Sequence, residues 1–478
     1  MDREPAVHPG EIVVELRPGA VDLSKTNLLG FSTEFLELLA MLRREHGLVR
    51  VEPYWPIGGH VLPKIGSVAL RLLPRPLREL IRALTGAAGE TPLDSTGFEE
   101  LLEAARLRLK ITFDPAAPVS EVLRALLGYA GVEFAEEIPV RWIPAFEPNS
   151  TAEMRAAFPK PPATHSREVV YPDPGPSGYW GRTVTAVPDE WDDYELDNIA
   201  VLDSGCDAKH TALTGRMNYL SSESALDRSG HGTFVSGILA ARAVAATPYV
   251  DPRIVSKDDC DVQRGLLPKS RLTVMSIMKP ETLYDEKGQP YFQVDPGRYS
   301  MALAKLVTLK NVRVLNLSIG GPKPVSKTEK KDLDALEKAG IVVVAAAGNG
   351  RTNADPVLYP ALHSTVVSVG AVRYTEPQGT PWDKSRTAFP PGYTGDRKTA
   401  VDLWAPGDWI LSTAPMDEGR RVIFSGWNSG TSMAAPFVTA TAAVLAAKYP
   451  ESSAAEIRGM LGQLRGEDGR LVCGEVML

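Results

Sequence analysis

Gly430-Thr431-Ser432-Met433-Ala434-Ala435-Pro436, near the end of the chain, decides how the rest of the sequence is interpreted. Residues 428–430 are turn formers, and the apolar run Ala434–Ala447 predicts a buried helix. Pro436 should stand in the first helical turn, which needs no intrahelical N–H. Ser432 would then lie beside unpartnered backbone N–H groups, at the positive end of the helix dipole. That place suits a hydroxyl that must ionise, and it equally suits a plain N-cap serine.

Length and composition limit the number of domains and the kinds of partner to expect. A chain of 478 residues with 44% apolar and 23% charged side chains should form two or three domains with a large core. Its net charge of −7 gives no reason to expect nucleic acid or an anionic membrane as a partner. Three scattered cysteines exclude a disulfide framework or a cysteine zinc site. No signal peptide or membrane-spanning run is visible, so we expect a cytoplasmic protein.

Two successive strand–helix–strand patterns precede residue 145. Each consists of a strand, a helix and a second strand, at 11–16, 33–45 and 48–53, and again at 107–113, 119–129 and 132–141. Such a pair predicts a split βαβ, ferredoxin-like α+β domain at residues 1–145. Extra helical sequence interrupts it at about 57–106. We assign no function to this insertion.

A proline-rich stretch separates that domain from the rest. Residues 146–178 contain seven prolines and few apolar side chains, which is typical of an extended, accessible linker. From residue 179 to 478 short, continuously apolar runs alternate with helical patterns. Strands buried on both faces have this composition. We therefore predict a doubly wound, mostly parallel α/β domain.

Polar side chains follow several of these predicted strands. Asp203 comes directly after the run 198–202, and Asn349 follows the run 341–347. His231 stands between two glycines at the start of a predicted helix. In an open parallel sheet, sites form at the carboxyl ends of the strands. Taken singly, Asp203 could cap a turn, Asn349 could belong to a Gly-Asn turn, and His231 could be a structural histidine.

Together with Ser432 they could hydrolyse amides. That reaction needs a hydroxyl nucleophile, an imidazole that takes and returns its proton, and a carboxylate that orients the imidazole. Neutral histidine suits proton transfer near pH 7. The side-chain amide of Asn349 could donate to the tetrahedral oxyanion beside the Ser432 backbone N–H.

Four motifs together resemble the subtilisin-like serine proteases, the subtilase family. They are Asp203-Ser204-Gly205, His231-Gly232-Thr233, Ala347-Gly348-Asn349 and the 430–436 stretch. The chain order Asp, His, Ser also agrees, whereas α/β-hydrolases and chymotrypsin-like enzymes use other orders. The resemblance covers about residues 180–449. It implies a serine endopeptidase in which Asp203 orients, His231 is the general base and acid, Ser432 is the nucleophile and Asn349 is the oxyanion donor.

The same resemblance implies a substrate groove and no required cofactor. Residues 317–321, including Ser318, Ile319 and Gly320, are similar to the segment that pairs with an extended substrate. Gly348 belongs to the same substrate-binding set. Gly350 and Leu358 align near the specificity pocket and offer no carboxylate to a basic side chain, so small or apolar residues should be preferred before the cut, although Asp355 lies close to them in sequence. The acidic cluster at 258–261 could hold structural calcium, although a solvated loop is the simpler interpretation.

The N-terminal domain is similar to a propeptide in place and form. Residues 132–137 resemble the end of one. The resemblance implies a self-inhibited precursor, a zymogen, whose N-terminal domain is an intramolecular inhibitor. We predict self-cleavage within 146–178. A partner-controlled interaction protein with a silent protease, activated by a protein partner, is the alternative, and a sedolisin-type acid peptidase is disfavoured because His231 stands where those enzymes use a carboxylate.

Overall fold

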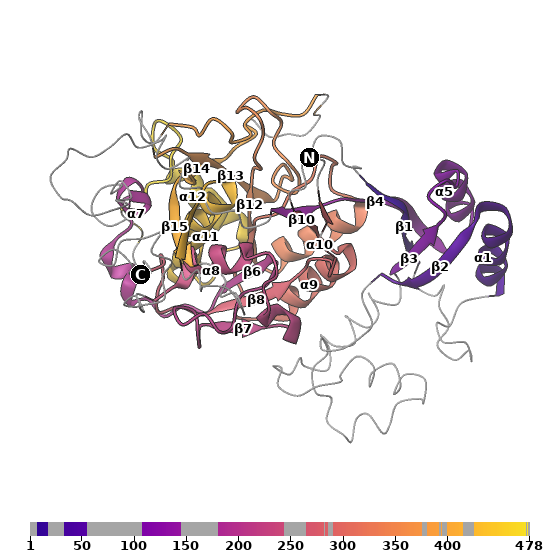
Figure 1. Cartoon of the computed structure of the whole chain (residues 1–478), viewed down its shortest axis with the longest axis horizontal. Coiled ribbons are helices and arrows are strands. Elements are labelled where there is room, and N and C mark those ends of the chain that lie inside the picture. Colours follow the sequence, from indigo (N-terminus) through magenta and orange to yellow (C-terminus); the bar gives the residue numbers. More distant parts are fainter. Residues whose placement is uncertain are drawn as a thin grey trace, which may run out of the picture. The chain divides into compact units, whose positions relative to one another are not determined.

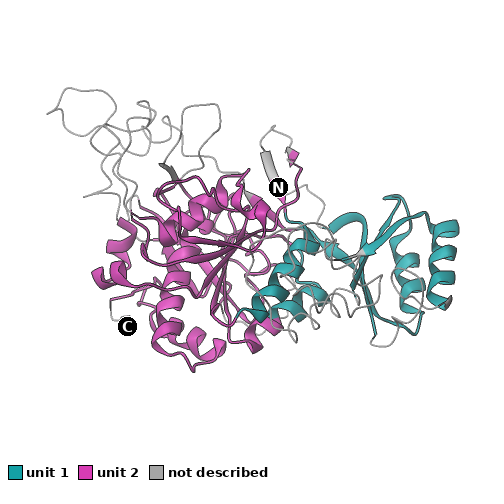
Figure 2. Ribbon diagram, turned by 90° about the horizontal axis from the view of Figure 1, so that it is seen from below, with its two compact units in different colours: residues 1–140, 294–309, 323–333 teal, residues 141–293, 310–322, 334–478 magenta. Residues whose placement is uncertain are grey.

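The computed structural model describes residues 7–17, 33–54, 108–144, 180–242, 264–281, 283–284, 290–374, 380–391, 393, 399–413, 425–474 and 476. The predicted insertion, linker and acidic cluster lie outside these residues. The chain divides into two compact units (Figure 2). The first comprises residues 1–140, 294–309 and 323–333, and the second comprises 141–293, 310–322 and 334–478.

The first unit is built on a four-stranded antiparallel sheet in the order β2-β3-β1-β4. Its strands are β1 (Val7–Leu16), β2 (Leu48–Pro53), β3 (Arg108–Phe113) and β4 (Val132–Pro139), connected within each half by α1 (Thr33–His46) and α5 (Val119–Leu127) (Figure 1). This is the order of a split βαβ, as the sequence pattern predicts.

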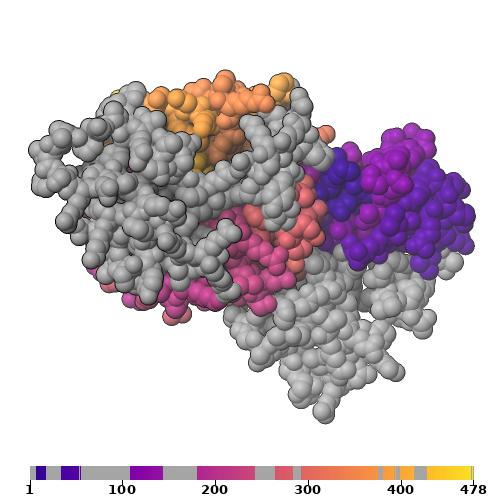
Figure 3. Space-filling view, in the orientation of Figure 1, coloured from indigo at the N-terminus to yellow at the C-terminus, as the bar shows by residue number. Residues whose placement is uncertain are grey.

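Alternation along β1 gives the sheet two buried faces. Ile12, Val14 and Leu16 pack into one apolar cluster with side chains of α1 and α5, such as Phe35 and Leu126. Figure 3 shows these elements as one densely packed body, coloured indigo to violet. Successive side chains of a strand point to opposite faces, so Glu15 lies on the other face.

On that other face the sheet contacts α9 (Pro296–Thr308) and the first part of α10 (Lys327–Lys338). Arg108 donates from Nε to Glu15 at 3.0 Å, and from Nη1 to Ser300 at 2.9 Å and to Asp332 at 2.6 Å. All four side chains are buried. Removing one partner from such a cluster leaves an uncompensated buried charge. The cluster therefore holds two helices and the sheet together within the first unit.

The second unit contains a seven-stranded parallel sheet in the order β14-β13-β12-β11-β6-β8-β7. These strands are β6 (Ile199–Asp203), β7 (Met217–Tyr219), β8 (Leu272–Ser276), β11 (Val314–Leu317), β12 (Val342–Ala346), β13 (Val366–Val372) and β14 (Leu403–Pro406). The predicted doubly wound α/β fold is confirmed.

Helices α8 (His231–Ala240) and α11 (Thr431–Lys448) pack into the core of this unit. Helix α12 (Ala454–Gln463) begins with a complete capping box of Ser453 and Glu456. None of the described helices is long and apolar enough to cross a bilayer.

Smaller elements complete the unit. A three-stranded sheet has the order β5 (Trp142–Pro144), β10 (Pro290–Gln293), β9 (Leu283–Tyr284), and β15 (Ile410–Thr413) pairs with β16 (Ser425–Asn428). Short helical turns lie at α7 (Trp180–Val184), Asp189–Asp193 and Ser222–Ala225.

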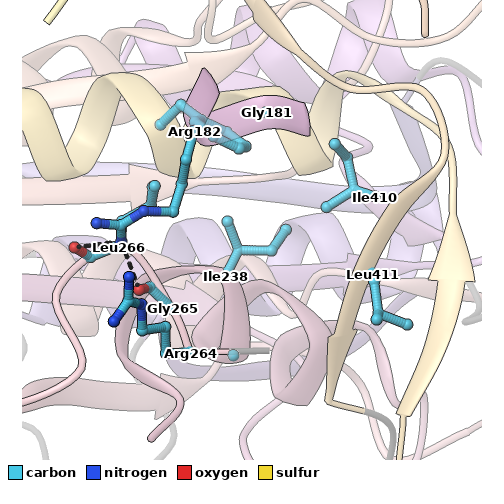
Figure 4. A pocket seen from close by; sticks show the side chains of 10 residues that line it. Gly181, Arg182, Ile238, Arg264, Gly265, Leu266, Ile410 and Leu411 are labelled. Atoms are coloured by element: carbon cyan, nitrogen blue, oxygen red, sulfur yellow. Dashed lines mark hydrogen bonds between the residues drawn. The ribbon is translucent and has the colours of Figure 1, made fainter. Parts of the chain in front are cut away.

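A small pocket lies where α7, α8 and β15 meet (Figure 4). Arg182 enters it and donates to the carbonyl oxygens of Gly265 at 3.1 Å and Leu266 at 3.4 Å. Arg182 and Arg264 both pair with Asp192, at 3.1 and 2.7 Å. The two guanidinium groups therefore tie α7 to the segment that leads into β8.

Candidate active site

Three neighbouring parallel strands end at the same edge of the sheet. In the register of the sheet, Leu317 of β11 lies beside Leu202 of β6 and Ala345 of β12. Asp203, Ser318 and Asn349 therefore emerge at one edge, within a few residues of these positions. This is the edge at which the sequence predicts a site.

Asp203 and His231 are in direct contact. Nδ1 of His231 lies 2.8 Å from Oδ1 and 3.1 Å from Oδ2 of Asp203, and both side chains are at most 1% exposed. Asp203 is the last residue of β6, and His231 is the first of α8. A β-carbon on Gly232 would clash with the carbonyl group of Gly205, so only glycine lets α8 begin this close to the strand end.

The surroundings of His231 raise the pKa of its imidazole above the usual value. Burial by itself would lower the pKa of His231, but the Asp203 carboxylate outweighs burial and raises that pKa, with a further contribution from Asp227. Nε2 of His231 has no hydrogen-bond partner within the described part of the chain. Nε2 therefore forms no hydrogen bond with the Ser432 hydroxyl in this structure. Such bonds often tighten only when substrate binds.

Ser432 is the second residue of α11 and is 5% exposed. The predicted place of Pro436 in the first turn is wrong, because α11 begins at Thr431 and Pro436 lies inside the helix. A proline there leaves the carbonyl group four residues earlier without its helical donor. That carbonyl belongs to Ser432, and the Ser318 hydroxyl donates to it at 3.2 Å. Ser318 thereby ties the predicted substrate segment to the serine.

Asn349 is oriented by Thr431. Its Oδ1 accepts from the backbone N–H of Thr431 at 2.9 Å and from the Thr431 hydroxyl at 3.0 Å. The side-chain NH2 group must then face away from Thr431. A β-carbon on Gly430 would lie 2.9 Å from this Nδ2, so the glycine leaves room for the amide. Asn349 thus presents a donor beside the start of α11.

The predicted substrate segment already pairs with an extended strand. The backbone N–H of Trp142 donates to Gly320 at 3.1 Å, and the N–H of Gly320 donates back at 3.3 Å. The strand that contains Trp142, β5 (Trp142–Pro144), also pairs with β10 in antiparallel register. The segment at 318–321 can therefore bind an extended peptide by main-chain hydrogen bonds.

Leu358 fills the space between two predicted substrate-binding residues, Gly320 and Gly348, which form two walls around it. A β-carbon on Gly320 would lie 2.8 Å from Cδ1 of Leu358, and one on Gly348 would lie 2.6 Å from it. Gly348 also has φ of +93°, which few other residues adopt. Ile319, the residue before Gly320, is buried. The leucine side chain therefore occupies the room between Gly320 and Gly348.

Sequence reasoning did not single out Ser204, Asp227 or Thr431. Thr431 fixes the Asn349 amide, and Ser204 donates its backbone N–H to Oδ1 of Asp203 at 2.7 Å. Asp227 accepts from the first turn of α8, including the N–H of Thr233 at 2.7 Å. Asp227 stands outside the usual N-cap position, which is Gly230, so the sequence gives no capping signal for it.

Metal binding finds no support in the described ranges. No group of three or more His, Cys, Asp or Glu side chains there could hold an ion. The acidic cluster at 258–261 lies outside them, so calcium binding stays a prediction.

A parallel sheet that brings a buried Asp–His pair, a helix-initial serine and an amide donor to one edge defines the class of serine hydrolases. Residues 198–464, more than half of the chain, match the sequence profile of the Subtilase family. The chain belongs to this family and is a subtilisin-like serine protease.

Individual relatives agree with that assignment. The chain is 30% identical to Subtilisin DY of Bacillus licheniformis over 270 residues, 55% of this chain and 81% of the relative. It is 28% identical to the Major intracellular serine protease of Bacillus subtilis (strain 168) over 266 residues, 53% of this chain and 69% of the relative. Among solved structures, the chain is similar to S41 Psychrophilic Protease, with 25% sequence identity and a TM-score of 0.45. The match covers 58% of this chain and 85% of that structure.

Proposed function

We propose that this protease cuts internal peptide bonds through Ser432, His231 and Asp203. Ser432 Oγ attacks the peptide carbonyl carbon while its proton passes to Nε2 of His231. The C–N bond then breaks, and Nε2 returns the proton to the leaving amine. Water repeats the sequence on the acyl-enzyme. Asp203 orients the imidazole and stabilises its charged form, and Asn349 donates to the oxyanion.

The contact between Asp203 and His231 carries this proposal. It is buried, it uses Nδ1 at 2.8 Å, and it therefore leaves Nε2 as the atom that can exchange a proton with a hydroxyl. The remaining groups are the nucleophile and the oxyanion donor. Ser432 near the start of α11 and the amide of Asn349, which contacts the neighbouring Thr431, would supply them.

A fluorophosphonate probe tests the assignment, because it labels only an activated serine. We expect labelling of Ser432, and loss of labelling and of peptidase activity in Ser432→Ala and in His231→Ala. Ser453 is the matched control, since it also begins a helix but acts as an ordinary N-cap. Ser453→Ala should label and cleave like the wild type. Full activity in Ser432→Ala would overturn the proposal.

We further propose that the enzyme is made as a self-inhibited precursor. Trp142 occupies the pairing position at Gly320 that an extended substrate would use, and this supports inhibition by the chain itself. Glu136, a few residues earlier on β4, accepts from the first N–H groups of α10, at 2.9 and 3.1 Å. These contacts support a docked inhibitor that follows the propeptide pattern. Activation by a protein partner, and a cytoplasmic setting, stay predictions.

A further inference from the structure

Asp227 is a partly buried carboxylate that accepts five hydrogen bonds. Its Oδ1 accepts from Ser204 Oγ at 2.7 Å, from Ser229 N at 3.1 Å and from Gly230 N at 2.8 Å. Its Oδ2 accepts from Thr233 N at 2.7 Å and from Thr233 Oγ1 at 2.6 Å. A turn cap needs only one or two such donors. The remaining contacts therefore ask for another explanation.

The donors lie on both sides of His231. Ser229 and Gly230 precede it, and Thr233 follows it on the first turn of α8. The carboxylate therefore fixes the backbone from which the imidazole projects. It also places negative charge at the positive end of the helix dipole.

Ser204 connects this carboxylate to the one that contacts His231. Its hydroxyl accepts from the N–H of Gly232 at 2.9 Å and lies 2.7 Å from Asp227 but 3.2 Å from Asp203. A hydroxyl has one proton to donate. The shorter distance assigns that proton to Asp227. Oδ1 of Asp203 is then left to the Ser204 backbone N–H and to the imidazole.

The two carboxylates both act on the charge of the imidazole. Burial lowers the pKa of His231, whereas Asp203, which contacts the ring from the end of β6, and the charge of Asp227, in the loop before α8, both raise it. Burial raises the pKa of Asp227 itself, and the donors Thr233 and Ser204 oppose that increase. The five hydrogen bonds thus help to keep a second negative charge close to the base.

We propose that Asp227 is a positioning residue for catalysis. Its carboxylate holds the first turn of α8 and the Ser204 hydroxyl together, so that the His231 ring stays aligned on Asp203 and its charged form is stabilised during proton transfer. This inference rests on the proposed roles of Asp203, His231 and Ser432.

The test measures the rate at which a fluorophosphonate labels Ser432 as a function of pH, per active site, in the full chain. Asp227→Asn keeps the shape of the side chain but removes its charge. We expect the plateau rate to fall about 10- to 100-fold, because small misalignments are costly. The acid limb of the pH profile of the labelling rate should move to lower pH by roughly 0.5 unit or more, because the protonated imidazole loses a stabilising charge. Asp402→Asn is the control: Asp402 accepts from the Ser368 N–H at 2.8 Å on another strand, and this variant should match the wild type.

Two further variants keep the proposal testable if Asp227→Asn folds poorly. Asp227→Glu retains the charge, so its acid limb should stay in place while its plateau falls. Ser204→Ala breaks the link to Asp203 but leaves Asp227 on α8, and it should lower the plateau without moving the limb. Suppose that Asp227→Asn has the plateau labelling rate and the acid limb of the wild type, while Ser432→Ala is not labelled. That result would overturn this inference and leave the proposed function intact. A Ser432→Ala variant that still cleaves peptides would instead overturn the proposed function.

Discussion

Both hydrogen bonds to the side-chain oxygen of Asn349 come from Thr431, at 2.9 and 3.0 Å. An amide held by its oxygen has a fixed direction for its NH2 group. A donor fixed before the reaction costs no reorganisation when charge develops. The sequence shows an asparagine after a strand, but the direction of its amide depends on a residue 82 positions further along the chain.

Asn349→Ala should lower kcat much more than it changes KM. The amide meets an oxygen that becomes strongly negative only in the transition state. Removal of one such donor in a subtilisin costs about 10²–10³-fold in kcat, and we expect a loss in that range. Steady-state kinetics on a peptide substrate measures it. Asn353→Ala, in the same loop, is the control and should leave kcat unchanged, and an equal kcat in both variants would reduce Asn349 to a turn residue.

Leu358→Ala should widen the range of residues accepted before the cut. The leucine lies close to both Gly320 and Gly348, so its truncation opens the space between these walls. We expect kcat/KM to rise about 10-fold or more for substrates with phenylalanine before the cut, relative to alanine. One methylene in an apolar pocket already changes this ratio about 10- to 200-fold.

A peptide series that differs only at this residue measures the ratio. Leu362→Ala is a control of the same type, because Leu362 is also buried and follows in the same segment. A ratio that changes equally in both variants would show a general loosening of the fold. An unchanged ratio in Leu358→Ala would place the specificity pocket elsewhere.

At the scale of elements, the sequence predicts the strands and helices well where burial decides them. The predicted runs 198–202 and 341–347 correspond to β6 and β12 and differ from them by one residue at each end. Runs of apolar residues buried on both faces produce this agreement. The apolar run that predicts α11 begins at Ala434, after the first residue of the helix, because Thr431 and Ser432 are polar. The predicted place of Ser432 in the first helical turn is confirmed.

The residues of the candidate site likewise fall into those that the sequence predicts and those that it does not. Asp203, His231, Ser432 and Asn349 could be predicted because each stands in a short motif beside a strand or helix end. The roles of Ser204, Asp227 and Thr431 could not, because they depend on hydrogen bonds between loops that are distant in sequence. The contacts of α9 and α10 with β3 were also beyond prediction, since Arg108 and Asp332 carry no pattern that indicates a pair.

Glu136→Ala should loosen the first turn of α10. The Glu136 carboxylate accepts from the N–H groups of Lys327 and Thr328, which have no partner inside the helix. Loss of such a cap costs about 1 kcal/mol. We expect amide exchange at these two residues to become roughly fivefold faster.

Hydrogen exchange in the Ser432→Ala background measures this effect without proteolysis. Glu137→Ala is the matched control, since Glu137 is the next residue on β4 and is exposed. Equal protection of Lys327 and Thr328 in both variants would contradict the capping role.

At the scale of the whole molecule, the compact units do not follow the predicted domain bounds. The first unit contains the N-terminal sheet together with residues 294–309 and 323–333. Those two segments lie inside the stretch that matches the Subtilase family. Within this unit, Arg108 of β3, paired with Glu15 of β1, donates to Ser300 and Asp332. An N-terminal domain with such contacts is a poor candidate for a loosely tethered module and a good one for an inhibitor that stays bound after a cut.

Wild-type protein and Ser432→Ala, expressed side by side, should therefore differ in chain length. Trp142 already pairs with Gly320, and the chain continues from Pro144, so a cut within 146–178 would be an intramolecular reaction favoured by a high effective concentration. We expect the wild type to lose an N-terminal fragment whose new end lies within 146–178, and Ser432→Ala to stay intact. Ser453→Ala should be cut like the wild type. Intact mass spectrometry and N-terminal sequencing give the result, and size-exclusion chromatography shows whether the fragment stays bound. A wild-type chain that remains full length would refute self-processing, and an equal cut in Ser432→Ala would assign it to another protease.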